Sequence, residues 1–187
     1  MAIATKSILA VTFLFFASST WGGTRELGTE ESLDLARYLG RWYQIALIPN
    51  KFQKKCARGT VADYSVGPGG ELEVTNSCER KDGTVMSATG VARINDDYND
   101  PARLEVSFAP EWMSWLSFVW GDYWILDIDS GYQAVLVGSP DLKLLWVLAR
   151  DVQIAQSTFR QFVLLAEEYG FPVHSIEIES GVVLLAE

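Results

Sequence analysis

The chain has 187 residues, with 15 Lys+Arg and 24 Asp+Glu, so its formal net charge is −9. Hydrophobic residues make up 49% and charged residues 21% of the chain, which excludes an intrinsically disordered protein, because disorder needs low hydrophobicity together with high charge. The acidic balance argues against nucleic acid as a partner, because domains that bind nucleic acid present a basic face. The length fits one domain.

Residues 1–22 differ from the rest of the chain in charge and polarity. Lys6 is their only charged residue, residues 8–17 (ILAVTFLFFA) form an apolar run, and small residues follow. This pattern predicts a secretory signal peptide over residues 1–22, with a buried N-terminal helix as the alternative. The run is shorter than the ~20 residues of a membrane-spanning helix. No lipobox cysteine stands near the cleavage zone, so we expect an exported protein, periplasmic or secreted and possibly membrane-associated.

Two cysteines, Cys56 and Cys78, flank a predicted β-hairpin. The runs 60–66 and 71–78 alternate in polarity around a Gly-Pro-Gly-Gly turn, which places the cysteines on opposite strands. They can meet if a bulge at Gly59 takes up the longer arm. In an oxidising compartment such a pair predicts one disulfide, with free thiols as the alternative. A zinc site would need about four ligands, which a chain with a single histidine does not supply.

Strand-like runs follow one another through the middle of the chain. A short helix over residues 32–40 comes first, capped by Ser32 and closed by Gly40. Turn residues then separate the runs without an intervening helix, which predicts an up-and-down antiparallel sheet that closes or forms a sandwich. The eight predicted strands are 42–48, 60–66, 71–78, 85–94, 103–108, 122–128, 132–138 and 143–149.

After the eighth run the apolar period changes to that of a helix. Residues 151–169 carry apolar side chains on one stripe, and Gly170 follows in the position that ends a helix. Residues 173–178 predict a short final strand.

Few residues of this chain match known catalytic or metal-binding motifs. The only histidine, His174, stands in the predicted last strand, where a solvated or core role is expected. The acidic segment 95–100 lacks the glycine and glutamate of a calcium loop, so a solvated loop is expected there. Asp127 and Asp129 stand at a strand end, where they favour turn chemistry. We therefore expect no enzyme, no metal and no cofactor.

The segment 110–124 (PEWMSWLSFVWGDYW) is unusually aromatic for a connection between two strands. Exposed apolar patches mark interaction sites, so this segment predicts a gate or a membrane-contact lip. The alternative is that it folds over the sheet as a plug. The aromatic residues assigned to the gate or lip are Trp112, Trp115, Phe118 and Trp120.

Three motifs stand in a characteristic order: Gly40-Arg41-Trp42-Tyr43, then Asp127-Ile128-Asp129 with Tyr132, then WVLAR ending at Arg150. Together with the eight runs and the late helix they resemble the lipocalin family. The stretches KFQKKC and ADYS are most similar to its bacterial Blc-like branch, to which apolipoprotein D is related. The resemblance implies a lipocalin domain over 32–180, with an all-β, eight-stranded antiparallel up-and-down barrel and one C-terminal amphipathic α-helix. Structural roles fall to Gly40, Trp42, Tyr43, Asp127, Asp129, Tyr132 and Arg150, with Trp42 closing the narrow end beneath Arg150.

Alternation along the strands then predicts which side chains line the barrel. On the second to fifth predicted strands, charged positions face water, so their neighbours face inward. Leu144 and Trp146 share the parity of Arg150, which is taken to point inward, and the resemblance adds Tyr123 and Ile125. Asn76 and the hydroxyls of Tyr64 and Tyr123 would orient a ligand in an otherwise apolar lining. The full predicted lining is Ala62, Tyr64, Leu72, Val74, Asn76, Met86, Ala88, Leu104, Val106, Phe108, Tyr123, Ile125, Leu144 and Trp146.

The resemblance implies an exported carrier or store for a small hydrophobic ligand, of the fatty acid or lysophospholipid class. An enzyme on the same scaffold would need a reactive group inside the barrel. A membrane- or partner-interaction protein acting through the aromatic loop 110–124 is the remaining alternative. The sequence leaves open whether the protein is a monomer or a homodimer.

Overall fold

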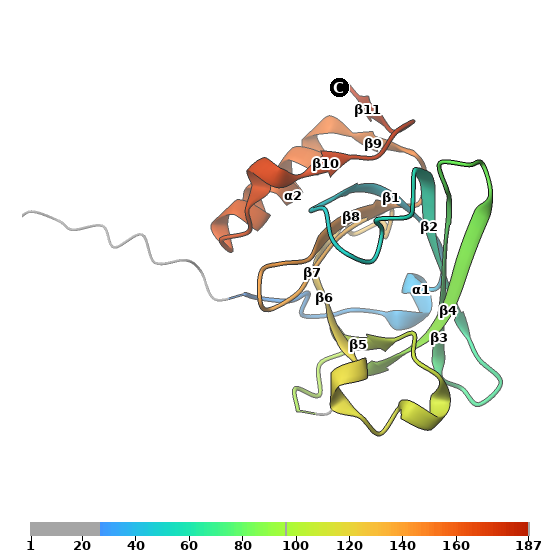
Figure 1. The fold of residues 1–187 in the computed structure, drawn as a ribbon. Helices are drawn as coiled ribbons and strands as arrows, with labels where there is room; N and C mark the ends of the chain where they lie inside the picture. The colour runs from blue at the N-terminus through green and yellow to red at the C-terminus, as the bar shows by residue number, and fades with distance from the viewer. Residues whose placement is uncertain (1–26, 96, 187) are drawn as a thin grey trace, which may run out of the picture.

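The computed structural model describes residues 27–95 and 97–186, so the predicted signal peptide lies outside the described residues. Eight antiparallel strands follow one another around a barrel, and β1 also pairs with β8, which closes it (Figure 1). The pairing of β1 with β8 joins the two outer strands of the eight-stranded sheet, so neither of them is left as a free edge. This confirms the predicted barrel. Its strands are β1 (Gly40–Leu47), β2 (Arg58–Val66), β3 (Leu72–Glu79), β4 (Val85–Ile94), β5 (Arg103–Ser107), β6 (Gly121–Ile128), β7 (Ala134–Gly138) and β8 (Leu145–Ala149).

Antiparallel connections alternate between the two ends of such a barrel. The connections β2–β3, β4–β5 and β6–β7 lie at one end, together with the N-terminal helix α1 (Leu35–Tyr38). We call this the closed end, because α1 and the buried Trp42 cover it. The connections β1–β2, β3–β4, β5–β6 and β7–β8 lie at the other end, which we call the open end.

Helix α1 starts later than the sequence predicts. The residue that caps it is Asp34, whose carboxylate accepts from the backbone N–H groups of Ala36 and Arg37, so the predicted cap at Ser32 is wrong. The helix is fixed in this register because the Asp34 backbone N–H donates to the hydroxyl of Tyr132 over 2.8 Å. Gly40 has a φ of 92°, which lets the chain turn sharply into β1.

The segment after β8 is richer in strands than predicted. It forms β9 (Gln153–Ala155), α2 (Gln156–Glu168), a 3-10 turn over Val173–Ser175, β10 (Glu177–Ile178) and β11 (Val183–Leu185). The β10 strand adds to β1, and β11 pairs in parallel with β9. The predicted helix therefore begins five residues too early, because 153–155 bond to the C-terminal strand instead. Among the described residues, no helix is long and apolar enough to span a bilayer.

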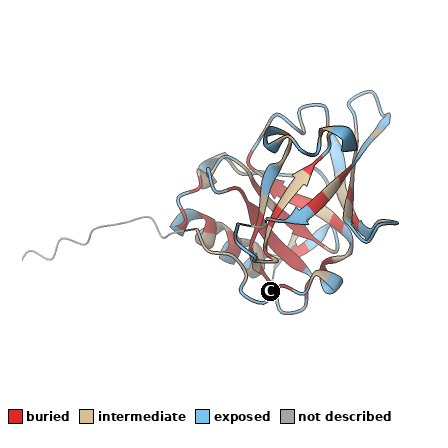
Figure 2. Ribbon diagram, turned by 90° about the horizontal axis from the view of Figure 1, so that it is seen from below, coloured by how far each residue is buried: buried red, intermediate tan, exposed pale blue. Residues whose placement is uncertain are grey.

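Two hydrophobic clusters share the barrel wall. One lies inside the barrel, around Trp42, Tyr64 and Leu104, and the other lies between the wall and α2, around Phe162 and Ala166. Strand β7 contributes to both, which explains why all five of its residues are buried. Figure 2 shows this uneven burial: red segments gather in the wall beside α2, whereas other strands carry exposed stretches.

The Cys56–Cys78 disulfide is present and joins the start of β2 to the end of β3, as predicted. The β2–β3 register shifts between Arg58 and Val61, and Gly59 has a φ of 64° at this irregularity. The bulge therefore lies on the longer arm of the hairpin, where it allows the two cysteines to meet.

Candidate functional site

The closed end of the barrel is sealed by a stack of aromatic and cationic groups. The Arg150 guanidinium lies 3.7 Å from the centroid of the Trp42 ring, which is fully buried. Arg150 also donates to the backbone carbonyls of Arg37, Arg41 and Tyr132, and the Trp42 indole donates to that of Tyr38. These bonds tie α1, β1 and the β6–β7 turn together, so they hold the closed end of the barrel in place.

Next to the closed end, three tyrosines meet inside the barrel. The hydroxyls of Tyr38 and Tyr123 share a hydrogen bond of 2.8 Å, and the Tyr64 ring lies edge-on to Tyr38 at 5.1 Å. Burial raises the pKa of all three phenols, so they remain protonated at neutral pH. Tyr64 and Tyr123 were expected from the sequence, whereas Tyr38 was not, because α1 brings it in from outside the sheet.

The predicted lining residues converge on the inner face in most cases. Val74, Leu104 and Ile125 are fully or almost fully buried toward the closed end, and Tyr64 lies beside them. Other members of the same cluster are only partly buried, so the burial of the inner face decreases toward the open end. These residues are Ala62, Leu72, Val106, Tyr123 and Trp146. The rings of Tyr123 and Trp146 stack with centroids 6.3 Å apart, which gives this half of the interior an aromatic wall.

Three further predicted lining residues lie at the rim of the barrel. Strand β5 pairs only with residues 91–94 of β4, so Met86 and Ala88 lie beyond its end. Both have the register of inward-facing residues, opposite Cys78 and Asn76, but Met86 is half-buried and Ala88 is exposed. Asn76 is itself half-buried between Ala62 and Ala88. These residues therefore belong to the rim of the barrel rather than to its enclosed interior.

Phe108 and Leu144 also differ from the prediction. Phe108 follows the end of β5, packs over Gly90 and remains 45% exposed at the rim. Leu144 lies before β8, in a turn whose backbone bonds to Ser139, and it packs against neither hydrophobic cluster. Leu144 therefore lies at the open end, one residue before β8 begins and outside both clusters.

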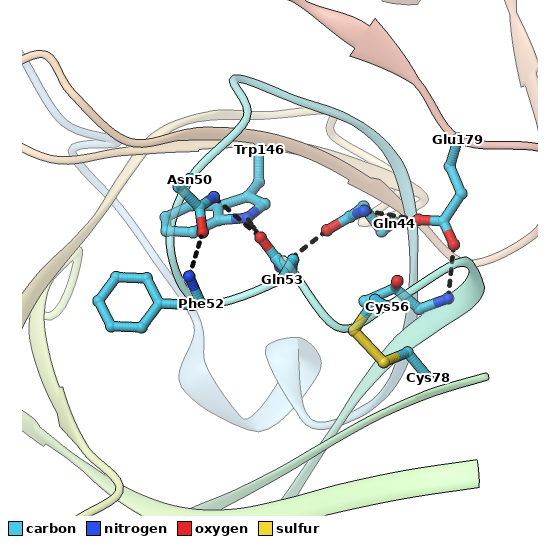
Figure 3. Close-up of a disulfide and its surroundings, with 9 residues drawn as sticks. Gln44, Asn50, Phe52, Gln53, Cys56, Cys78, Trp146 and Glu179 are labelled. Carbon is cyan, nitrogen blue, oxygen red and sulfur yellow. Dashed lines mark hydrogen bonds between the residues drawn. A yellow bond between two sulfur atoms is a disulfide. The ribbon is translucent and has the colours of Figure 1, made fainter. Parts of the chain in front are cut away.

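The β1–β2 connection contributes a polar group that the sequence did not indicate. The side-chain oxygen of Gln53 accepts from the indole of Trp146 at 3.2 Å and from the Asn50 amide at 2.8 Å. The Gln53 amide donates to Gln44, which in turn donates to the carboxylate of Glu179 (Figure 3). The connection is thereby held against the open end of β8, with the disulfide at its base.

The aromatic segment between β5 and β6 folds as two 3-10 turns, Glu111–Met113 and Ser117–Val119. Trp112, Trp115 and Phe118 are 73%, 78% and 76% exposed, so the alternative of a plug over the sheet is wrong for them. Trp120 differs: it is half-buried, and the Arg93 guanidinium lies 3.8 Å from its ring centroid. Three of the four aromatic residues are therefore free to meet another surface.

The acidic residues singled out in the sequence have turn and surface roles. Asp129 accepts from the backbone N–H groups of Gly131 and Gln133 and shapes the β6–β7 turn. Asp127 lies in an outer groove of about 470 Å³ beside α2, where burial and the neighbouring Glu30 raise its pKa. Within the described ranges, no group of three or more His, Cys, Asp or Glu residues could hold a metal ion.

Comparison with known proteins agrees with this architecture. A model of the lipocalin-like domain matches residues 33–180. Temperature-induced lipocalin-1 of Arabidopsis thaliana is 36% identical over 81% of each chain, and outer membrane lipoprotein Blc of Citrobacter freundii is 30% identical over 90% of this chain and 92% of Blc. The structure of insecticyanin from Manduca sexta has the same fold, with a TM-score of 0.63 and 16% identity over 88% of this chain and 92% of that one. This chain therefore belongs to the lipocalin family, and Blc is among its homologues.

Proposed function

We propose that this protein carries or stores one small hydrophobic ligand, of the fatty acid or lysophospholipid class, inside its barrel. Membership of the lipocalin family supports the binding of small hydrophobic ligands. The observation that carries the finer proposal is the graded interior, in which an apolar and aromatic wall becomes accessible toward the open end at Val106, Tyr123 and Trp146. An eight-stranded barrel of this kind is wide enough for one such ligand.

The chemistry of this wall suits an acyl chain. Burial of apolar area contributes roughly 25 cal/mol per Å², so aliphatic and aromatic side chains favour a long hydrocarbon. The phenols of Tyr64 and Tyr123 within this wall, and the amide of Asn76 at the rim, are polar groups available to orient a ligand. We propose a binding protein without catalytic activity, exported from the cell.

The test is stoichiometric uptake of a fluorescent fatty acid, followed by its displacement with lysophospholipid. Val106→Trp should fill the upper interior and weaken binding at least tenfold, although overpacking costs about 1–3 kcal/mol of stability. Val85→Trp is the matched control, because Val85 is 75% exposed and points away from the interior by its register. Normal binding by a folded Val106→Trp variant would contradict the proposal.

A second candidate function, contact with a membrane or a partner through the aromatic loop 110–124, is favoured by the exposure of Trp112, Trp115 and Phe118. Scattered exposed apolar residues are ordinary, but three large ones on one short segment are not. The double variant Trp112→Ser with Trp115→Ser should alter adsorption or ligand exchange while stability changes little. Complete loss of fatty acid binding in that variant would place the ligand site on the loop itself.

A further inference from the structure

The lysines of this chain are distributed unevenly over the fold. Within residues 27–95 and 97–186, every lysine lies on a connection at the open end: Lys51, Lys54 and Lys55 between β1 and β2, Lys81 between β3 and β4, and Lys143 between β7 and β8. All five are exposed. The chain as a whole carries a net charge of −9, so the described lysines gather at one end of an acidic protein, whereas its arginines are spread over the fold.

Most of these charges are not neutralised by neighbours. Lys143 pairs with Asp141 at 2.9 Å, but no ion pair among the described residues involves Lys51, Lys54 or Lys55. The open-end connections 48–57, 80–84, 108–120 and 139–144 together hold six basic and three acidic residues. An unpaired, exposed cluster of this sign is available to an anionic surface.

The same end of the barrel carries the exposed aromatic residues. Phe52, between Lys51 and Gln53, is 61% exposed, and the aromatic loop presents Trp112, Trp115 and Phe118 from the β5–β6 connection. The Lys51 ammonium lies 5.1 Å from the Phe52 ring centroid, so charge and apolar surface are interleaved on one connection. Tryptophan and phenylalanine bind at the boundary between the headgroups and the acyl chains of a bilayer, and lysine is attracted to anionic lipid headgroups.

We propose that the open end is a docking face for a bilayer that contains anionic phospholipid. The face consists of Phe52, Trp112, Trp115 and Phe118 as inserting groups, with Lys51, Lys54 and Lys55 as the charges that select the lipid. Charge complementarity favours this occupant, because the face joins unpaired, exposed lysines to exposed aromatic side chains. It deepens the second candidate function above, and it would bring the barrel opening against the membrane from which a lipid ligand would be loaded.

The test is sedimentation of the purified full chain with vesicles of phosphatidylcholine alone or with about 30% phosphatidylglycerol. We expect binding to the anionic vesicles only, a blue shift of tryptophan emission, and release by high salt, because screening shortens the reach of exposed charges. Neutralisation in Lys51→Gln/Lys54→Gln/Lys55→Gln should weaken binding roughly 100-fold, since each lysine near the surface contributes about fivefold. The triple Lys→Arg variant at the same positions retains the charge and should bind as the parent chain does.

Three results would overturn the proposal. The first is equal adsorption to neutral and anionic vesicles, and the second is unchanged binding by the triple Gln variant. The third is the absence of binding to anionic vesicles, including the case in which a purified soluble protein binds saturably to the same face instead. Fatty acid uptake by the triple Gln variant in solution is measured in parallel and should be unchanged. Failure of that uptake in the parent chain would contradict the carrier function while leaving the membrane result to stand by itself.

Discussion

The indole N–H of Trp146 donates to the side-chain oxygen of Gln53 over 3.2 Å, which joins the inner face of β8 to the connection between β1 and β2. The same glutamine bonds to Asn50 and to the buried Gln44. One side chain therefore holds the β1–β2 connection against the opening through which a ligand would pass.

Removal of this contact should loosen the opening. In Gln53→Ala we expect a stability loss of about 1 kcal/mol for each hydrogen bond removed, and ligand dissociation several times faster. Stopped-flow displacement of a fluorescent fatty acid measures the rate. Lys54→Ala, on the same connection and exposed, is the control. Unchanged dissociation despite a lower melting temperature would show that Gln53 only stabilises the fold.

A mutation at the closed end of the barrel should lower the stability of the fold and leave the affinity for the ligand nearly unchanged. Trp42→Ala removes a fully buried ring beneath Arg150 and should lower the free energy of unfolding by about 3–5 kcal/mol. Urea unfolding measures this loss, and Trp42→Phe should show a smaller one. Where the variant is still folded, fatty acid affinity should remain close to that of the parent chain. An unchanged melting temperature with abolished binding would mean that Trp42 contacts the ligand.

The disulfide should stabilise the folded protein mainly by restricting the conformations of the unfolded chain. Cys56 and Cys78 are 22 positions apart, and a loop of this size predicts about 3 kcal/mol from chain entropy. Cys56→Ser with Cys78→Ser should lose about this much in urea unfolding, while far-ultraviolet circular dichroism keeps the signature of the barrel. Two alkylatable thiols in the unreduced, denatured protein would contradict the premise.

Glu179 should make stability depend on pH. Burial raises the pKa of this carboxyl, and the hydrogen bonds from Thr60 and Gln44 oppose that effect only in part. Since the folded chain then binds the proton more tightly than the unfolded chain, the contribution of Glu179 to stability increases as pH falls through its folded pKa. Lowering the pH from about 7 to about 5 should thus favour the parent chain relative to Glu179→Gln. A stability difference that does not change with pH would refute this.

Alternation and turn residues are local signals, so the chain predicts eight consecutive antiparallel strands, and the three motifs that resemble lipocalins predict their closure into a barrel. The sequence also predicts the disulfide, since the turn between the β2 and β3 runs places the two cysteines on opposite strands. The inward parity of Val106 and Trp146 follows from the period of two, once one residue on each strand is taken to face inward.

Contacts between segments that are distant in the chain could be seen only in the folded structure. The cap at Asp34 depends on a hydroxyl 98 positions away, and β9 becomes a strand because it pairs with β11. Gln53 reaches Trp146 across 93 positions, and the lysines come from three separate connections. No local pattern encodes such meetings, because they arise from closure of the barrel and from the packing of the terminal segments against its wall.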